Sequence, residues 1–346
     1  MIADLTRKLG LGIAAAGVLT ALGAGSTLAQ SDAQFFAGKT IEIWIGAAPA
    51  GGYDVNARAV ARYWPDHIAG KPTIVPKNRP GAGSLLATNL VFNTAPKDGT
   101  VIGAPSRAVL TMPLLGVENA KFDPTTANWV GSTATEDSTC VAWHTIGIKT
   151  LADAQKTKLF VGTSGPGSST HTYALLLQNL FGAKFELISG YPDGKGTQIA
   201  LERGEVQGTC GSFSSLKTQK PDWVREKKVN FLVLIGANRD PDLPDVPSVM
   251  ELTTTDEQRD ILKVVLAPQT AGRPLFLPPD VPMDRVTVLR RAFDATVKDP
   301  RFLEDAKKIG LEVNPATGEQ IQQILKDVYS LPAATVEKAR EYLESR

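Results

Sequence analysis

Histidine and cysteine are scarce in this sequence, with three and two copies in 346 residues. The histidines His67, His144 and His171 lie far apart and lack the spacing of metal ligands, so the sequence offers no zinc site. No C-x-x-C motif is present, which argues against a thioredoxin-like redox site. We therefore expect no metal and no cofactor.

An excess of charge of one sign is also missing. Lysine and arginine total 37, aspartate and glutamate total 36, and the formal net charge is +1. No long basic or acidic run interrupts the chain. Nucleic acid and anionic membrane surfaces are therefore poor partners for this protein.

Long apolar runs are confined to the N-terminus. Arg7 and Lys8 precede "LGLGIAAAGVLTALGAG", and "STLAQ" follows with small residues around Ala29. A charged start, a short apolar stretch and a small-residue exit predict a secretory signal peptide over residues 1–29. The alternative is an N-terminal anchor, but the run is short for a bilayer span. We expect a soluble exported protein, located in the periplasm.

Export changes the interpretation of the two cysteines. In an oxidising compartment an even pair can form a disulfide, so Cys140 and Cys210 are a candidate pair. Two buried free thiols, or a redox pair, are the alternatives that the sequence leaves open.

Apolar runs alternate with amphipathic stretches, which is the pattern of an α/β protein. The first half predicts a parallel βαβαβ unit, in which Asp54 and Ser84 begin the helices. Its predicted strands are 40–48, 72–78 and one within 97–106, and its predicted helices are 53–64 and 83–95. The middle of the chain repeats this alternation of strands and helices. Its predicted strands are 138–144, 158–165, 184–191, 206–212 and 229–236.

One helix of the middle unit has clear end signals. Ser168 or Ser169 is expected to cap one helix and Gly182 to end it. The tail from Pro278 is expected to be helical. The sequence thus predicts two α/β domains joined by a hinge with a ligand cleft between them, as in periplasmic binding proteins. Domain 1 comprises residues 30–132 and 237–346, and domain 2 comprises 133–236.

Three glycine-rich turns each follow a strand and open a helix. They are "APAGGYD" (48–54), "NRPGAGS" (78–84) and "GTSGPGSST" (162–170). Unpaired N–H groups and the positive end of the helix dipole favour an anion at such a turn. One turn alone is ordinary structure, but three at one sheet edge predict carboxylate or phosphate recognition.

The loop 162–171 fails the catalytic templates. A nucleophile elbow needs a glycine where Pro166 stands, and a P-loop needs a lysine after Gly167. A secreted hydrolase or transferase that uses Ser164 and His171 remains the alternative function.

Three further side chains near the turns have two interpretations each. Arg107 follows the third strand and faces either the cleft or the core. Tyr53 stacks on a ligand or packs internally, and Asp193 is a turn residue or a ligand contact.

Several segments together resemble the substrate-binding proteins of tripartite tricarboxylate transporters, also called the Bug family. They are "GGYDVNAR", "VPKNRPGAGS" followed by "APKDGTVIG", "GTSGPGSSTH", "ALERGEVQG" and "DLPDVPSVME". The resemblance implies a binding protein, not an enzyme, that closes over a small carboxylate and delivers it to the membrane subunits of such a transporter. It also implies a monomer. A ligand sensor that uses the same cleft is the remaining alternative.

Carried onto this chain, the resemblance and the turns give a set of ligand-binding candidates. Ala50 and Tyr53 depart from the family's usual first loop, which leaves the size of the ligand open. The candidates are Ala50, Gly51, Gly52, Tyr53, Asp54, Gly81, Ala82, Gly83, Ser84, Arg107, Ser164, Gly167, Ser168, Ser169 and Asp193.

Overall fold

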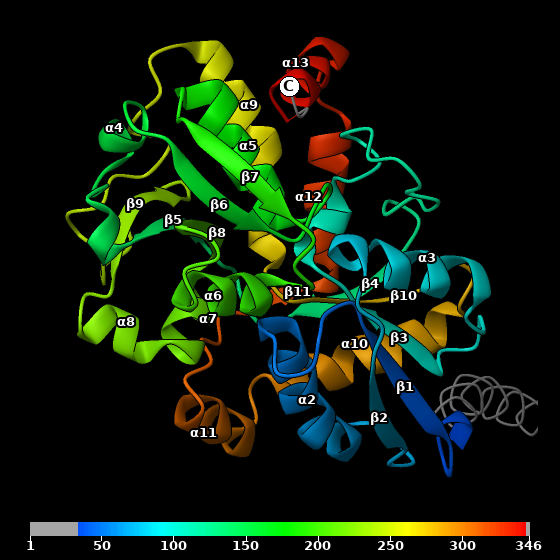
Figure 1. Cartoon of the computed structure of the whole chain (residues 1–346). Helices are drawn as coiled ribbons and strands as arrows, with labels where there is room; N and C mark the ends of the chain where they lie inside the picture. Colours follow the sequence, from blue (N-terminus) through cyan, green and yellow to red (C-terminus); the bar gives the residue numbers. More distant parts are fainter. Residues whose placement is uncertain (1–33, 344–346) are drawn as a thin grey trace, which may run out of the picture.

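The computed structural model describes residues 34–343 (Figure 1). The predicted signal peptide, residues 1–29, lies outside the described residues. In the described part of the chain, no helix is both long and apolar enough to cross a bilayer.

The chain forms two separate β-sheets, each covered by helices (Figure 1). The first sheet has the strand order β11-β4-β10-β3-β1-β2, and the second has the order β7-β6-β8-β5-β9. The first sheet comprises β1 (Thr40–Ile45), β2 (Thr73–Asn78), β3 (Val101–Ala104), β4 (Asn128–Ser132), β10 (Pro274–Leu277) and β11 (Ala316–Thr317). The second comprises β5 (Ser138–Trp143), β6 (Leu159–Thr163), β7 (Phe185–Ser189), β8 (Gly208–Ser212) and β9 (Val229–Ile235). The predicted two-lobed α/β class is confirmed.

The helices connect these strands and cover both sheets. They are α2 (Gly52–Tyr63), α3 (Leu85–Thr94), α4 (Leu151–Ala154), α5 (Ser169–Phe181), α6 (Gly194–Glu202), α7 (Phe213–Gln219), α8 (Pro221–Arg225), α9 (Asp256–Leu266), α10 (Met283–Thr296), α11 (Pro300–Lys308), α12 (Gly318–Tyr329) and α13 (Ala333–Leu343). Short 3₁₀ turns are η1 (Trp64–His67), η2 (Ala82–Ser84), η3 (Arg107–Leu110), η4 (His144–Ile146) and η5 (Ala267–Ala271).

Strand directions agree with the sequence in part. β1 pairs in parallel with β2 and with β3, which confirms the predicted parallel unit. β4 and β10 pair antiparallel to each other. In the second lobe β6 is parallel to β7 and β8, but β5 is antiparallel to β8 and β9. β5 begins at the edge of the sheet where β8 ends, because Ser138 pairs with Ser212. β5 therefore runs in the direction opposite to the other four strands of this sheet.

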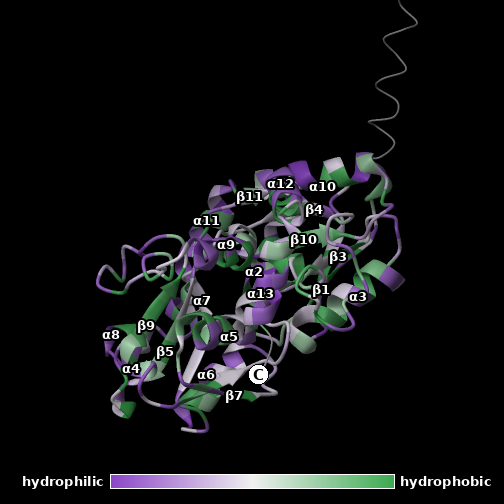
Figure 2. Ribbon diagram, turned by 90° about the horizontal axis from the view of Figure 1, so that it is seen from above, coloured by the Kyte–Doolittle hydropathy of each residue, from purple (hydrophilic) through white to green (hydrophobic). Residues whose placement is uncertain are grey.

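The core follows the period of each element. In β1 the alternate residues Ile41, Ile43 and Ile45 are fully buried, as a half-covered strand requires. Figure 2 colours strands such as β5 and β9 mainly as hydrophobic, whereas the outer helices α10 and α12 carry hydrophilic segments. Burial of such apolar side chains makes the main favourable contribution to the free energy of folding.

The C-terminal part of the chain contacts both lobes. Ile261 and Leu262 of α9 and Ala339 of α13 lie in the same buried cluster as Leu176 and Leu177 of α5, and Figure 1 places these helices together. This cluster belongs to the second lobe, although α9 and α13 follow its last strand. The domain boundaries at 132/133 and 236/237 therefore remain a proposal.

Helix ends confirm some expectations and correct one. Ser168 caps α5, and Gly182 ends it with a φ of 71°. Asp54 is not the N-cap of α2, because the helix begins after Gly51. Asp54 lies in the first turn of α2 and accepts a hydrogen bond from the Ala50 amide at 2.7 Å.

Candidate ligand-binding cleft

A cavity of about 870 Å³, including its open mouth, is lined by residues of both lobes. The first lobe contributes the start of α2, η2, the residues after β3, and Arg273. The second lobe contributes the starts of α5 and α6, strand β8 and one face of α7.

The first glycine-rich turn is held from behind by Asp54. Its carboxylate accepts hydrogen bonds from Ala50 N at 2.7 Å, from Arg58 Nε at 2.8 Å and from Asn78 Nδ2 at 2.7 Å. Asp54 is only 2% exposed. Its role in this structure is to shape the turn, which leaves Gly52 and Tyr53 to line the cavity.

The second turn has an unusual backbone. Gly81, Ala82, Gly83 and Ser84 all have positive φ values, a conformation that costs free energy at the two non-glycine residues. The hydroxyl of Ser84 donates to Gly46 O at 2.8 Å and accepts from Ser106 N at 2.8 Å. Ser84 thus ties the ends of β1 and β3 together beside the cavity.

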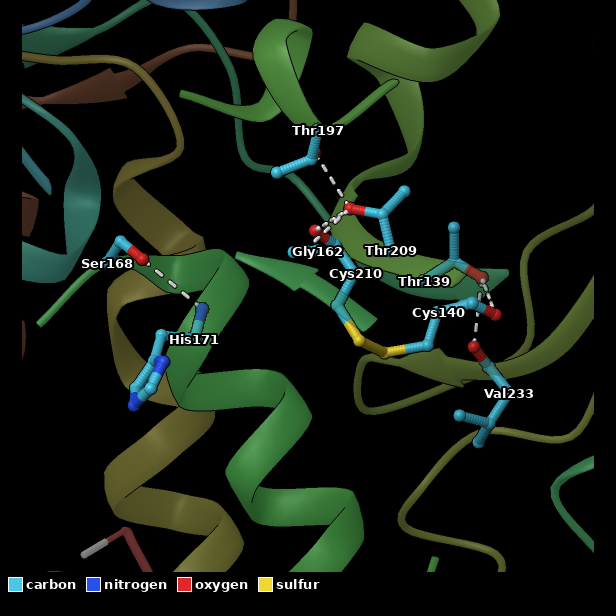
Figure 3. The surroundings of a disulfide bond; sticks show 9 residues. All are labelled: Thr139, Cys140, Gly162, Ser168, His171, Thr197, Thr209, Cys210 and Val233. Carbon is cyan, nitrogen blue, oxygen red and sulfur yellow. Dashed lines mark hydrogen bonds between the residues drawn. A yellow bond between two sulfur atoms is a disulfide. The ribbon is translucent and has the colours of Figure 1, made fainter. Parts of the chain in front are cut away.

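The third turn, residues 162–171, forms the N-terminus of α5. The Ser168 hydroxyl accepts from His171 N at 3.2 Å and donates to Gly165 O at 2.7 Å. Figure 3 shows the bond from Ser168 to the His171 amide. Ser169 extends toward the first lobe, with its Oγ 3.4 Å from Ser106 Oγ. The positive end of α5 therefore meets the cavity.

We expect Ser168→Ala to lower the free energy of unfolding by about 1 kcal/mol, because the cap of α5 is lost. Chemical unfolding of the ligand-free protein measures this change. Ser169→Ala is the matched control: it removes only the long contact to Ser106, so we expect a change within about 0.5 kcal/mol. Equal losses in the two variants would contradict the capping role.

His171 is tied into this turn. Its Nδ1 lies 3.2 Å from Thr163 Oγ1, and burial lowers the pKa of its imidazole. The Ser164 hydroxyl accepts a bond from Thr170 Oγ1 at 3.3 Å. These contacts give both residues a part in holding the loop.

Asp193 joins the two lobes. One carboxylate oxygen caps α6 by accepting from Gly196 N at 3.0 Å, and the other accepts from Ala48 N of the first turn at 3.2 Å. The side chain lines the cavity. A carboxylate from the second lobe thus occupies one amide donor of the first lobe.

A buried charged centre lies between the lobes. Arg107 donates from Nη1 to Glu136 O at 2.8 Å and from Nη2 to Ser138 Oγ at 2.5 Å. Arg273 Nη2 lies 2.5 Å from Glu136 Oε1 and donates to Ser215 Oγ at 2.6 Å. Arg107, Glu136 and Arg273 are 1%, 5% and 4% exposed. Two buried guanidinium groups therefore share the Glu136 carboxylate.

The charge of Arg107 survives this burial. Desolvation favours its neutral form, but Tyr173, Tyr53 and Glu136 oppose that effect, and the pKa of Arg107 rises above its ordinary value. Since both guanidinium groups line the cavity, this end of the cleft favours an anion.

Cys140 and Cys210 form a disulfide between directly opposite residues of β5 and β8 (Figure 3). Both are 1% exposed. Cys210 also lines the cavity, so the disulfide braces the strand that forms its floor.

The structure brings together many of the predicted site residues. Those that line the cavity are Gly52, Tyr53, Gly83, Ser84, Arg107, Ser164, Ser168, Ser169 and Asp193. Those outside its lining are Ala50, Gly51, Asp54, Gly81, Ala82 and Gly167, the last of which lines a smaller neighbouring cavity.

Sequence reasoning missed part of the lining. The missed polar residues include Ser106, Thr139, Thr197, Gln198, Thr209, Gln219 and Arg273. A signal for Ser106 was available, because it directly follows β3 as the three turns follow their strands. For Gln219, its spacing of four residues from Ser215 on one helix was the available signal.

Comparison with known proteins finds a family model and a relative that match most of this chain. The model of the family described as "Tripartite tricarboxylate transporter family receptor" matches residues 57–339. The "UPF0065 protein in gbd 5'region" of Cupriavidus necator is 27% identical over 337 residues, which cover 94% of this chain and 95% of the relative.

Two solved structures share the fold. The periplasmic binding protein BugD has a TM-score of 0.69 and 22% identity, covering 88% of this chain and 95% of its own. MatC from Rhodopseudomonas palustris, with bound malate, has a TM-score of 0.69 and 19% identity, covering 88% of this chain and 99% of its own.

Proposed function

Because the chain belongs to the tripartite tricarboxylate transporter receptor family, we propose that it is a periplasmic solute-binding protein for a small carboxylate. Its proposed partners are the membrane subunits of a tripartite tricarboxylate-type transporter, to which it delivers the ligand. It acts as a monomer and catalyses no reaction on the ligand. The bound malate of MatC supports a carboxylate ligand.

The observation that carries this proposal is the cavity between the lobes, with two helix N-termini and a buried pair of guanidinium groups in its wall. The proposed ligand contacts are the predicted residues that line it. The backbone N–H groups at α2 and α5 and the side chain of Arg273 suit a carboxylate oxygen.

Binding is proposed to act through the arrangement of the lobes. Asp193 reaches Ala48, and Ser169 reaches Ser106, so the walls of the cavity belong to different lobes. A ligand that contacts both walls favours the closed arrangement, because only there does it gain both sets of interactions. The membrane subunits would recognise this closed form.

We expect a carboxylate ligand to raise the unfolding temperature of the mature protein. A ligand that binds only the folded state stabilises it by about 2.7 kcal/mol at a concentration of 100 times its Kd. Thermal unfolding against a panel of mono-, di- and tricarboxylic acids measures this shift, with phosphate, sugars and neutral amides as controls.

Recovery of the acid after incubation completes the test. An acid that stabilises the protein and is recovered unchanged supports the binding function. If an acid is consumed, the hydrolase or transferase alternative replaces it. If none of the carboxylates stabilises the protein, the carboxylate-binding proposal is wrong.

A further inference from the structure

Two glutamine side chains in the cavity wall are not satisfied by the protein. Gln198 lies on α6 and Gln219 ends α7, and both line the cavity. Their Oε1 atoms are buried and accept no hydrogen bond from the described part of the chain. Gln198 is only 6% exposed.

An unsatisfied buried acceptor of this kind calls for an explanation, because it loses its hydrogen bonds to bulk water without gaining a protein donor. The oxygen and nitrogen of an amide can be exchanged in assignment, but in either orientation the side chain carries one acceptor and one NH₂ donor. A ligand hydroxyl can match both, because it donates one hydrogen bond and accepts others.

The surroundings of the two amides fit this chemistry. Thr209 Oγ1 donates to Thr197 Oγ1 at 2.8 Å, next to Gln198 in the wall of the cavity. Ser215 lies one turn from Gln219 on the same face of α7 and accepts from Arg273. Hydroxyl and amide side chains thus occur together in this wall, alongside apolar side chains such as Val141 and Leu216.

The charged end of the cavity lies close to one of the amides. Residues four apart on a helix have Cβ atoms about 5–6 Å apart, so Gln219 is within one turn of the Arg273 contact at Ser215. A carboxylate at Arg273 therefore places the next few carbon atoms of the same ligand near the Gln219 amide. Hydroxyl groups on those carbons would find their partners there.

We propose that Gln198 and Gln219 select a polyhydroxylated carboxylate over its deoxy analogue. The inference rests on the proposed function, since it names the class of ligand for the same cleft. The carboxylate meets the guanidinium end, and the hydroxyl groups bind the two amides.

Isothermal titration of the wild-type protein with matched pairs of acids tests this selectivity. The pairs are gluconate against hexanoate and galactarate against adipate, each with six carbons and the same number of carboxylates. We expect at least one hydroxylated acid to bind tenfold or more tightly than its partner. Equal or weaker binding of both hydroxylated acids would overturn the inference and leave the proposed function intact if adipate or hexanoate binds.

The failure of all four acids would also overturn the inference. The broader panel of carboxylates then decides separately whether the proposed function survives, because a stabilising acid without hydroxyl groups supports the function alone.

Gln198→Met and Gln219→Met assign the selectivity to these side chains. Methionine has a similar length and no hydrogen-bonding amide. We expect each variant to bind the preferred hydroxylated acid about tenfold more weakly, with the deoxy partner unchanged within about threefold. Gln323→Met, at an exposed position of α12, is the control and should bind as the wild type does. Equal loss for both members of a pair would contradict a role in reading hydroxyl groups.

Discussion

Glu136→Ala is expected to lower the free energy of unfolding by about 3–5 kcal/mol, because it leaves two buried guanidinium groups without their shared carboxylate. Glu136 Oε1 lies 2.5 Å from Arg273 Nη2, and Oε2 lies 3.4 Å from Arg107 Nη1. Ser214 also donates to this carboxylate at 2.8 Å. Denaturant unfolding of the ligand-free variant and wild type measures the loss.

The exposed pair of Lys158 and Glu186 supplies the matched control. Its atoms are 2.6 Å apart, but the two side chains are 64% and 47% exposed. Solvent screens such a pair, so Glu186→Ala should cost less than about 1 kcal/mol. If Glu136→Ala cost no more than the control, the centre would not stabilise the contact between the lobes.

Glu136→Gln separates charge from hydrogen bonding. Its amide oxygen can still accept from Arg273 or Ser214, while the negative charge is gone. We expect a loss between those of the alanine variant and the control. Asp137 does not replace the missing charge fully, because burial raises the pKa of its carboxyl even though Arg107 lowers it.

Elements dominated by local signals were predicted well from the sequence. The parallel arrangement of β1, β2 and β3 follows from alternating strands and helices, and right-handed crossovers leave few other topologies. The cap of α5 at Ser168 follows from a hydroxyl just before an apolar periodic stretch. In these cases, short stretches of neighbouring residues determine the structure.

Contacts between distant parts of the chain were not predictable in this way. Glu136 and Arg273 were missed because the residues around each of them give no sign of the other. Folding brings the two residues together from remote segments of the chain. The return of α9 onto α5 was missed for the same reason. Asp54 was placed correctly at the start of α2 but was wrongly predicted to be its N-cap, since a carboxylate in the first turn of a helix can reach back to the preceding loop.

The cleft shows how the two kinds of information combine. The glycine-rich turns identified part of the cavity wall in each lobe, because each turn follows a strand whose end faces the cleft. The α7 face and the charged centre complete the other sides, and they depend on how the second lobe packs against the first. The sequence therefore predicted part of the lining of this candidate cleft, whereas residues such as Gln198 and Arg273 were found only from the structure.

Gly83→Ala should weaken ligand binding about 100-fold by holding the lobes apart. A Cβ atom on Gly83 would lie 2.8 Å from Ser168 Cα and 2.9 Å from Ser168 N, in the backbone of the other lobe. Backbone atoms cannot rotate away as the end of a flexible side chain can. The lobes must separate instead, and the cost falls on the closed, ligand-bound arrangement. A 100-fold loss corresponds to about 2.7 kcal/mol.

Gly38→Ala separates this clash from backbone strain. Gly38 has a φ of 68°, close to the 62° of Gly83, and a Cβ atom there meets no described atom within 4 Å. Both variants should lose about 1 kcal/mol of stability from the left-handed backbone, but only Gly83→Ala should lose affinity. Calorimetric titration with the best carboxylate of the panel measures the affinity of each variant, and denaturant unfolding measures its stability. Equal affinities would mean that the ligand binds without closure of Gly83 onto Ser168, and the hinge-closure mechanism would then be wrong.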